Sequence, residues 1–161
     1  RGSYMVGALS RININHEHLN PRAKAMATEL GLSIPCHNPF MITWAQIVET
    51  AHEVEEAKQI VDHLLAQGLR EEKPPVHVQA GRGVGAVEAP RGLLIHDYTY
   101  DDTGHVTKAN LIIPTNQNNG SIQEDLEVLV RENLDKSEDE LRLLCEMLVR
   151  AYDPCIGCST H

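Results

Sequence analysis

The spacing of apolar residues predicts one long amphipathic helix in the first half of the chain. Asn38-Pro39 places an N-cap residue before a proline at the first helical position, and Gly68 provides a stop. Over residues 39–67, apolar side chains recur at helical intervals and the other face is largely acidic. Asn20-Pro21 is the same start signal for a shorter helix, predicted over 21–30. The apolar positions of the long helix are Phe40, Trp44, Ile47, Val48, Ala51, Val54, Val61, Leu64 and Leu65.

The pattern changes to that of β-strands after residue 76. Residues 92–100 and 105–113 are rich in Ile, Leu, Val, Thr and Tyr. Between them lies Asp101-Asp102-Thr103-Gly104, a turn sequence with glycine at a position that can take a positive φ. These features predict a β-hairpin over about 92–113.

Two capping boxes predict the helices of the last third of the chain. The spacing Ser-x-x-Glu occurs at residues 121–124 and again at 137–140, each time before an amphipathic stretch. The helices predicted in this way cover about 122–133 and 138–152. Pro154 ends the second, because proline cannot continue a helix.

The composition is that of an ordinary globular protein. Of 161 residues, 42% are hydrophobic and 4% aromatic, so the core must be aliphatic. No apolar run approaches the roughly 18 residues of a membrane span, and residues 1–20 lack the zones of a secretory signal. The net charge of −9 argues against non-specific binding to nucleic acid. We expect a mainly α-helical fold with a small β-hairpin or sheet element (α+β) in a single domain over 1–161.

The strongest chemical signal is the pair Cys155 and Cys158, close to the end of the chain. A CxxC spacing places two thiolates on one side of a tight turn, where they can chelate one soft metal ion. Asp153 is close enough in sequence to accept a proton or to orient a ligand, and His161 adds an imidazole and a carboxylate. The spacing alone leaves half of a zinc site and a dithiol redox pair as alternatives, and no second CxxC accompanies it.

The glycine-rich segment over residues 81–92 fits neither GxGxxG after a strand nor a Walker loop. We interpret it as a close-packed backbone bend that presents Arg91, with Pro90 fixing the approach. The Arg91 guanidinium has two possible roles: an ordinary ion pair with Glu88, or a fixed donor to an anionic ligand. Thr115, which follows the predicted hairpin, either caps a segment there or hydrogen-bonds a ligand.

Together these segments resemble the C-terminal part of a [NiFe]-hydrogenase large subunit. The resemblance rests on four stretches that occur in the expected order: 4–11 (YMVGALSR), 88–92 (EAPRG), 113–115 (IPT) and 150–161 (RAYDPCIGCSTH). The pattern DPCxxCxxH at a C-terminus is highly specific. The residues in and around this motif are most similar to those of the cytoplasmic, cofactor-linked group of multisubunit hydrogenases. This similarity implies a cytoplasmic location.

The resemblance implies two metal sites. Cys155 would be a terminal nickel ligand and Cys158 would bridge nickel and iron in a Ni-Fe(CN)2CO centre. His161 and the backbone carbonyl of Leu111 would bind a nearby magnesium ion.

The resemblance also implies roles for residues around the nickel–iron centre. Arg91, carried beside Pro90, would donate to one cyanide ligand and could serve as a base in H₂ cleavage. Thr115 would donate to the other cyanide, and Asp153 would be a further polar neighbour of the metal-bound groups. A fixed cation stabilises bound anions, so these residue types suit the site.

One departure from the family pattern limits what the chain can do by itself. The family's other two metal cysteines come from an N-terminal RxCGxC motif, which this sequence lacks, and Cys36 and Cys145 have the wrong neighbours. The family's large subunits are also several times longer. We therefore expect a C-terminal fragment that is inactive and free of metal in isolation. Its expected partners are the N-terminal remainder of the subunit, an iron–sulfur small subunit and cofactor-reducing subunits. The alternative is a non-catalytic zinc-binding or subunit-interaction module.

Overall fold

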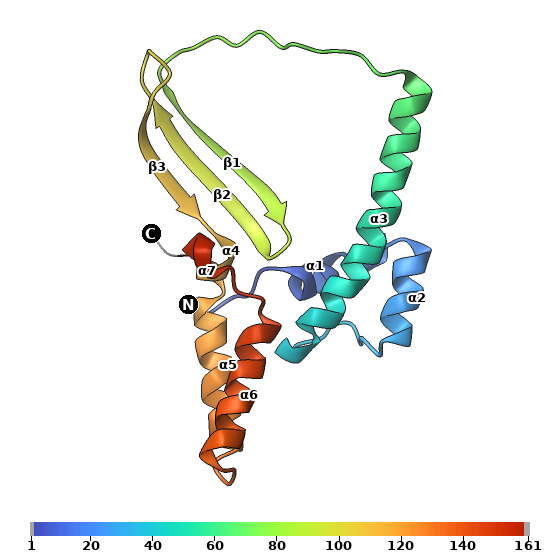
Figure 1. Cartoon of the computed structure of the whole chain (residues 1–161), viewed down its shortest axis with the longest axis vertical. Helices are drawn as coiled ribbons and strands as arrows, with labels where there is room; N and C mark the ends of the chain where they lie inside the picture. Colours follow the sequence, from blue (N-terminus) through green and yellow to red (C-terminus); the bar gives the residue numbers. More distant parts are fainter. Residues whose placement is uncertain (1, 160–161) are drawn as a thin grey trace.

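The computed structural model describes residues 2–159, with side chains over 2–158. It is mainly helical with one small antiparallel sheet, as predicted (Figure 1). The helices are α1 (Ala8–Asn15), α2 (Pro21–Glu29), α3 (Ile42–Gln67), α4 (Pro114–Gln117), α5 (Asn119–Glu132), α6 (Glu138–Ala151) and α7 (Ile156–Ser159), with 3-10 turns η1 (His16–His18) and η2 (Pro39–Met41). The strands are β1 (Gly81–Ala89), β2 (Gly92–Tyr100) and β3 (Val106–Ile112). None of these helices is both long and apolar enough to cross a membrane.

The hydrophobic core lies where α1, α2, the start of α3 and the end of α6 meet. Its largest fully buried side chains are Leu9, Ile12, Val48 and Leu148, which makes the core aliphatic as expected. Helix α1 is not marked by a start signal or an apolar pattern in the sequence. This helix is only eight residues long, so packing of its apolar side against α3 stabilises it rather than its intrinsic propensity.

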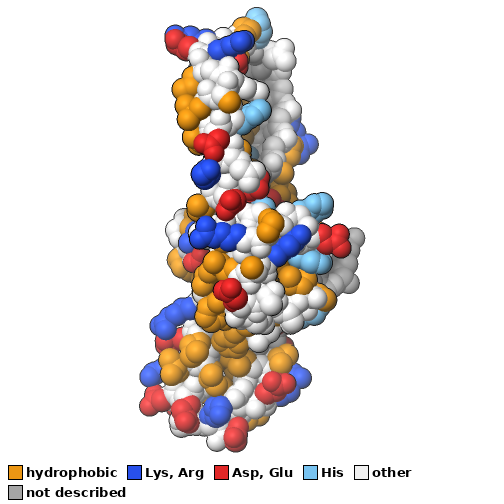
Figure 2. Space-filling model, turned by 90° about the vertical axis from the view of Figure 1, so that its right-hand side faces the viewer, with side chains coloured by type: hydrophobic (Ala, Val, Ile, Leu, Met, Phe, Trp, Pro, Cys, Tyr) orange, Lys and Arg blue, Asp and Glu red, His pale blue; other side chains and the backbone are white. Residues whose placement is uncertain are grey.

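The long helix forms, but much of its apolar face is exposed. It begins with the 3-10 turn η2, and α3 then continues to Gly68, whose φ of +81° ends it as predicted. Only Ile42, Ala45 and Val48 are buried. The apolar side chains farther along the helix, Val54, Val61, Leu64 and Leu65, are exposed. Figure 2 shows hydrophobic side chains on the surface at several levels of the molecule.

The predicted hairpin is present as β2 and β3, and β1 extends it to a three-stranded antiparallel sheet. The interpretation of residues 81–92 as a bend is wrong for most of its length, because residues 81–89 pair with β2 as a strand. Glycine-rich strands lack the β-branched residues that mark a strand in sequence, and here the pairing partner determines the conformation. The remaining Pro90-Arg91 forms the two-residue turn between paired Ala89 and Gly92.

Helices α5 and α6 lie side by side at the end of the molecule opposite the sheet (Figure 1). The capping box of α6 is confirmed, with Ser137 and Glu140 each accepting from the other's backbone N–H. The predicted box of α5 is wrong, because that helix begins earlier, at Asn119, and Ser121 lies inside it. The Ser121 hydroxyl instead donates to the carbonyl of Tyr4 at 2.9 Å.

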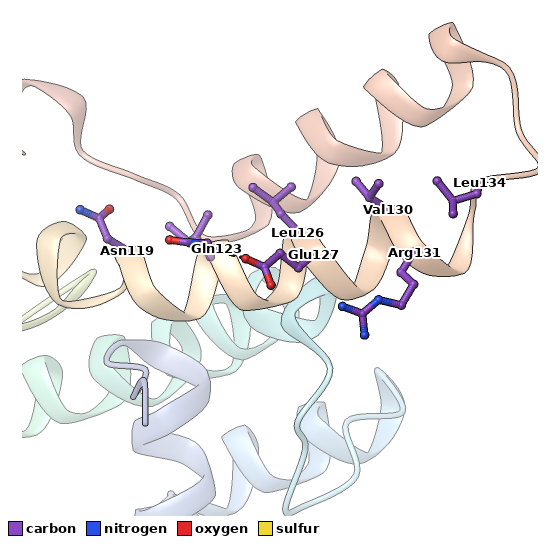
Figure 3. A pocket seen from close by; sticks show the side chains of 8 residues that line it. Asn119, Gln123, Leu126, Glu127, Val130, Arg131 and Leu134 are labelled. Carbon is purple, nitrogen blue, oxygen red and sulfur yellow. Dashed lines mark hydrogen bonds between the residues drawn. The ribbon is translucent and has the colours of Figure 1, made fainter. Parts of the chain in front are cut away.

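A shallow apolar groove runs along α5. Figure 3 shows Leu126 and Val130 on the side of α5 that faces α6 and Leu134 just beyond the end of α5, while Glu127 and Arg131 point away. The amphipathic pattern predicted for this helix is therefore present.

Candidate metal centre

The two cysteines of the CxxC motif lie just after α6, in residues 153–158, called the cysteine turn below. Helix α6 ends at Ala151, and Asp153 takes a positive φ of 51° that redirects the chain before Pro154. Cys155 comes directly before the one-turn helix α7, and Cys158 lies within it. The Cα atoms of Cys155 and Cys158 are 5.3 Å apart, and their sulfurs are paired as a disulfide. Cys155 is half-buried and Cys158 is exposed. The predicted placement of both sulfurs on one side of a tight turn is confirmed.

Tyr152 anchors the start of this turn. Its side chain is buried and its hydroxyl donates to the carboxylate of Asp125 on α5. Burial and this hydrogen bond both raise the pKa of Tyr152 above its usual range, so the hydroxyl keeps its proton. The end of α6 is thereby fixed against α5, directly before the cysteines.

Thr115 lies beside the first cysteine. It is buried on α4, the short helix that follows β3, and its Oγ1 accepts from the backbone N–H of Cys155 at 3.0 Å. A hydroxyl oxygen that accepts one hydrogen bond still has its own proton to donate. Thr115 therefore holds the cysteine turn and can also donate to a bound group.

Arg91 reaches the same turn from the tip of the β1–β2 hairpin. Its Nε donates to the backbone carbonyl of Asp153 at 2.7 Å, and another guanidinium nitrogen donates to the Asp153 carboxylate at 3.2 Å. Gln46 on α3 donates to the other carboxylate oxygen at 3.1 Å. The side chains of Arg91 and Asp153 are each 40% exposed, so both can still meet a ligand. The alternative of an Arg91–Glu88 ion pair is wrong, because Glu88 pairs with Arg11.

Arg11, to which the sequence motifs assign no role, makes a dense set of polar contacts near the site. Its guanidinium donates through two nitrogens to the carboxylate of Glu49 on α3, at 2.6 and 2.7 Å. It also donates to Glu88 at 2.7 Å and to the carbonyls of Ala89 and Pro90 at 3.0 Å. The hydrogen bonds to Glu49 and Glu88 raise the pKa of Arg11 further above its already high value. The signal in the sequence was its position in the opening stretch 4–11.

The N-terminal segment crosses closely over the hairpin turn. Gly92 has a φ of +133°, and a Cβ atom there would lie 2.5 Å from Cγ2 of Val6. Asn118, which is buried, accepts from the N–H of Val6 at 2.8 Å and donates to its carbonyl at 3.0 Å. These contacts hold the chain start against the elements that carry Arg91 and Thr115.

Similarity to known proteins covers nearly the whole chain. A family model described as nickel-dependent hydrogenase matches residues 4–161. The chain belongs to the nickel-dependent hydrogenase family. The resemblance inferred from the sequence motifs is confirmed.

Individual relatives agree with this assignment. The sulfhydrogenase 1 subunit alpha of Pyrococcus furiosus is 34% identical over 158 residues, which are 98% of this chain and 37% of that subunit. The NAD-reducing hydrogenase HoxS subunit beta of Cupriavidus necator is 32% identical over 168 residues, covering 100% of this chain and 34% of the relative. A crystal structure of an NAD⁺-reducing [NiFe]-hydrogenase superposes with a TM-score of 0.78 at 32% identity, covering 99% of this chain and 36% of that one. The chain thus spans about a third of the length of these relatives.

The expected magnesium site remains a prediction. His161 lies outside the described residues, and Leu111 is on β3, where it is paired in register with His96. Within residues 2–159 no cluster of three or more His, Cys, Asp or Glu side chains is arranged to hold a metal ion. Of the predicted site residues, the structure brings Cys155, Cys158, Arg91, Thr115 and Asp153 together.

Proposed function

We propose that this chain forms the nickel-binding C-terminal part of a [NiFe]-hydrogenase large subunit, and that the intact enzyme interconverts H₂ with protons and electrons. The observation that carries the proposal is the convergence of two distant segments, the hairpin tip and α4, on the cysteine turn. The hairpin tip contributes Arg91, which bonds Asp153, and α4 contributes Thr115, which bonds Cys155. These are the residues that the family motifs identify.

The residues at this turn fit a nickel–iron group in their donor chemistry. Thiolates are the ligands that soft metals prefer, and two sulfurs lie side by side at Cys155 and Cys158. In the reduced protein, the thiolates of Cys155 and Cys158 would hold the nickel–iron group. When bound, the Ni-Fe(CN)2CO centre supplies the site at which H₂ is cleaved.

The neighbouring polar residues would orient that group and stabilise its charge. The Arg91 guanidinium is held by Asp153 and half exposed, so it offers a fixed positive charge and an N–H to an anionic cyanide. The Thr115 hydroxyl, whose oxygen is occupied by the Cys155 N–H, has its proton left for a second cyanide. The backbone carbonyl of Pro90 already accepts from Arg11, which fixes the turn next to Arg91.

The remaining requirements of the site would come from elsewhere in the enzyme. Two more thiolates would come from the N-terminal remainder of the large subunit, and an iron–sulfur small subunit would carry electrons to cofactor-reducing subunits. Large apolar side chains exposed on α3, β1 and α6 support such partners, since extensive exposed apolar surface is typical of interaction sites. We further propose a cytoplasmic enzyme, with magnesium bound by His161 and the Leu111 carbonyl.

The proposal is tested by cysteine substitutions in the intact enzyme that contains this chain. Cys155→Ser and Cys158→Ser should each abolish H₂ uptake and strongly lower the nickel content of the purified complex. Cys145→Ser is the matched control, because Cys145 lies within α6 and outside the turn. Normal nickel content and H₂ uptake in both turn variants would contradict the assignment.

The second candidate function is a structural zinc module. The observation behind it is the cysteine pair itself, because two neighbouring sulfurs supply half of a tetrahedral zinc site. Elemental analysis of the isolated chain distinguishes the two. Stoichiometric zinc, retained after competition with a chelator, supports the module, whereas a chain free of nickel, iron and zinc fits a hydrogenase part that needs its missing ligands.

A further inference from the structure

The Arg11 guanidinium joins three elements at one point beside the metal centre. Its side chain is 19% exposed, and its five N–H groups reach Glu49 on α3, Glu88 on β1 and two backbone carbonyls of the hairpin tip. A guanidinium offers five donors in a rigid planar fork, and all of them have acceptors here. A simple stabilising ion pair would not use all five donors.

The two carbonyl contacts matter most for the site. The carbonyls of Ala89 and Pro90 belong to the peptide groups that lead directly to Arg91. Each residue has only two soft backbone dihedrals, so holding the planes of these two peptide groups restricts the backbone that leads into Arg91. The direction in which the Arg91 side chain leaves the turn is restricted with it. Arg11 thereby restricts Arg91 without contacting the cysteine turn itself.

Helix α3 contacts both Arg11 and Asp153. Glu49, which anchors Arg11, lies three residues after Gln46, which donates to the Asp153 carboxylate. Residues three apart lie on the same side of a helix. One face of α3 therefore supports both the hairpin tip that carries Arg91 and the turn that carries Cys155 and Cys158.

We propose that Arg11 is a positioning residue, which sets the Arg91 guanidinium over the cysteine turn by clamping the Ala89 and Pro90 carbonyls to Glu49. The proposal rests on the proposed function, in which Arg91 donates to a ligand of the nickel–iron centre. Lysine cannot replace Arg11, because a single ammonium group has three donors and cannot reach a carboxylate and two carbonyls in one plane.

The test uses Arg11→Lys and Arg11→Gln in the intact enzyme, with nickel and iron content, infrared bands of the cyanide ligands and H₂-uptake kinetics as readouts. We expect both variants to retain the metals and to shift a cyanide band, because the donor from Arg91 moves. We expect kcat to fall by roughly tenfold to 100-fold, the usual cost of a misplaced group near reacting atoms. Arg82→Gln is the matched control, since Arg82 makes a similar two-pronged pair with Asp97 on the sheet, away from the cysteines.

A double variant separates positioning from general stabilisation. In an Arg91→Lys background, adding Arg11→Lys should change kcat and the cyanide bands little, because the group that Arg11 positions is already altered. Equal losses in both backgrounds would overturn the proposal, as would unchanged cyanide bands in the single variants. Loss of folding or of metal in both Arg11 variants would also overturn it, by showing a structural role alone. Absence of nickel and of cyanide bands from the unaltered enzyme would instead overturn the proposed function itself.

Discussion

Thr115 and Cys155 are forty residues apart in sequence, and the Thr115 hydroxyl oxygen accepts the backbone N–H of Cys155 at 3.0 Å. The hydroxyl belongs to a buried side chain on α4, whereas the N–H belongs to the turn after α6. This hydrogen bond ties the cysteine turn to the end of the sheet.

We therefore expect Thr115→Val to destabilise the protein by about 1 kcal/mol, the usual net value of one lost hydrogen bond. Valine has nearly the shape of threonine, so packing is preserved while the acceptor is removed. Thr115→Ser keeps the oxygen and is the control, although it loses a methyl group. The measurement is chemical denaturation followed by circular dichroism. A stability of Thr115→Val equal to that of the unaltered protein would show that the hydrogen bond contributes nothing.

Gly92→Ala should be among the more disruptive small substitutions in the chain. The position has a φ of +133°, and the added Cβ would lie 2.5 Å from Cγ2 of Val6. Strained backbone of this kind costs about 1–3 kcal/mol per residue, and the clash adds to it. Gly83→Ala on β1 is the control, since a Cβ there meets no atom within 4 Å. Thermal unfolding of the two variants compares them, and equal Tm values would contradict the close crossing.

The helix signals could be recognised in the sequence because they are local. Asn20 accepts from the N–H of Ala23, and Ser137 forms its box with Glu140, as the spacing predicted. The Ser121 box failed because α5 begins at Asn119, next to α4, so the same spacing falls inside a helix. A short motif predicts a cap only where the tertiary structure lets a helix start there.

The full sheet and the contacts of the site could not be predicted from residue spacing alone. β1 is a strand because it pairs with β2, although its glycines signalled a bend. The cysteine turn is a local feature and was predicted, whereas the pairing of Arg91 with Asp153, rather than with the nearby Glu88, depends on how the hairpin tip meets α6. The five donors of Arg11 find acceptors between residues 49 and 90, which no sequence pattern links.

Asn118→Asp is expected to destabilise the protein although it changes only one atom. Both polar groups of the Asn118 side chain are hydrogen-bonded: its oxygen accepts from the N–H of Val6, and its NH₂ donates to the carbonyl of Val6. An aspartate would lose the donor and place a buried negative charge against the carbonyl oxygen, which costs about 1–3 kcal/mol or more. Asn116→Asp, the same substitution at an exposed position of α4, should change stability by no more than roughly 0.5 kcal/mol. Urea denaturation midpoints of the two variants provide the comparison, and equal midpoints would contradict a role for the Val6 contact.

The turn between β2 and β3 should lose stability in acid. Asp101 accepts from the hydroxyl and N–H of Thr103, at 2.6 and 2.9 Å, and from the N–H of His105 at 2.9 Å. These hydrogen bonds favour the carboxylate and hold the pKa of Asp101 below its usual value. A lowered pKa in the folded state gives stability that is fully present above the unfolded pKa, which is about 3.9, and that is lost as the pH falls through the folded pKa.

Asp101→Asn removes this pH dependence and so measures it. The Tm of the unaltered protein should exceed that of Asp101→Asn by a constant amount between about pH 5 and pH 7, and the difference should shrink as the pH falls below about 4. The neighbouring Asp102→Asn, at an exposed position of the same turn, controls for the general effect of removing one negative charge. Because protonated Asp101 resembles asparagine in charge, the two Tm curves should converge in strong acid. A Tm difference that stays constant down to about pH 2 would mean that the Asp101 hydrogen bonds do not depend on its ionisation.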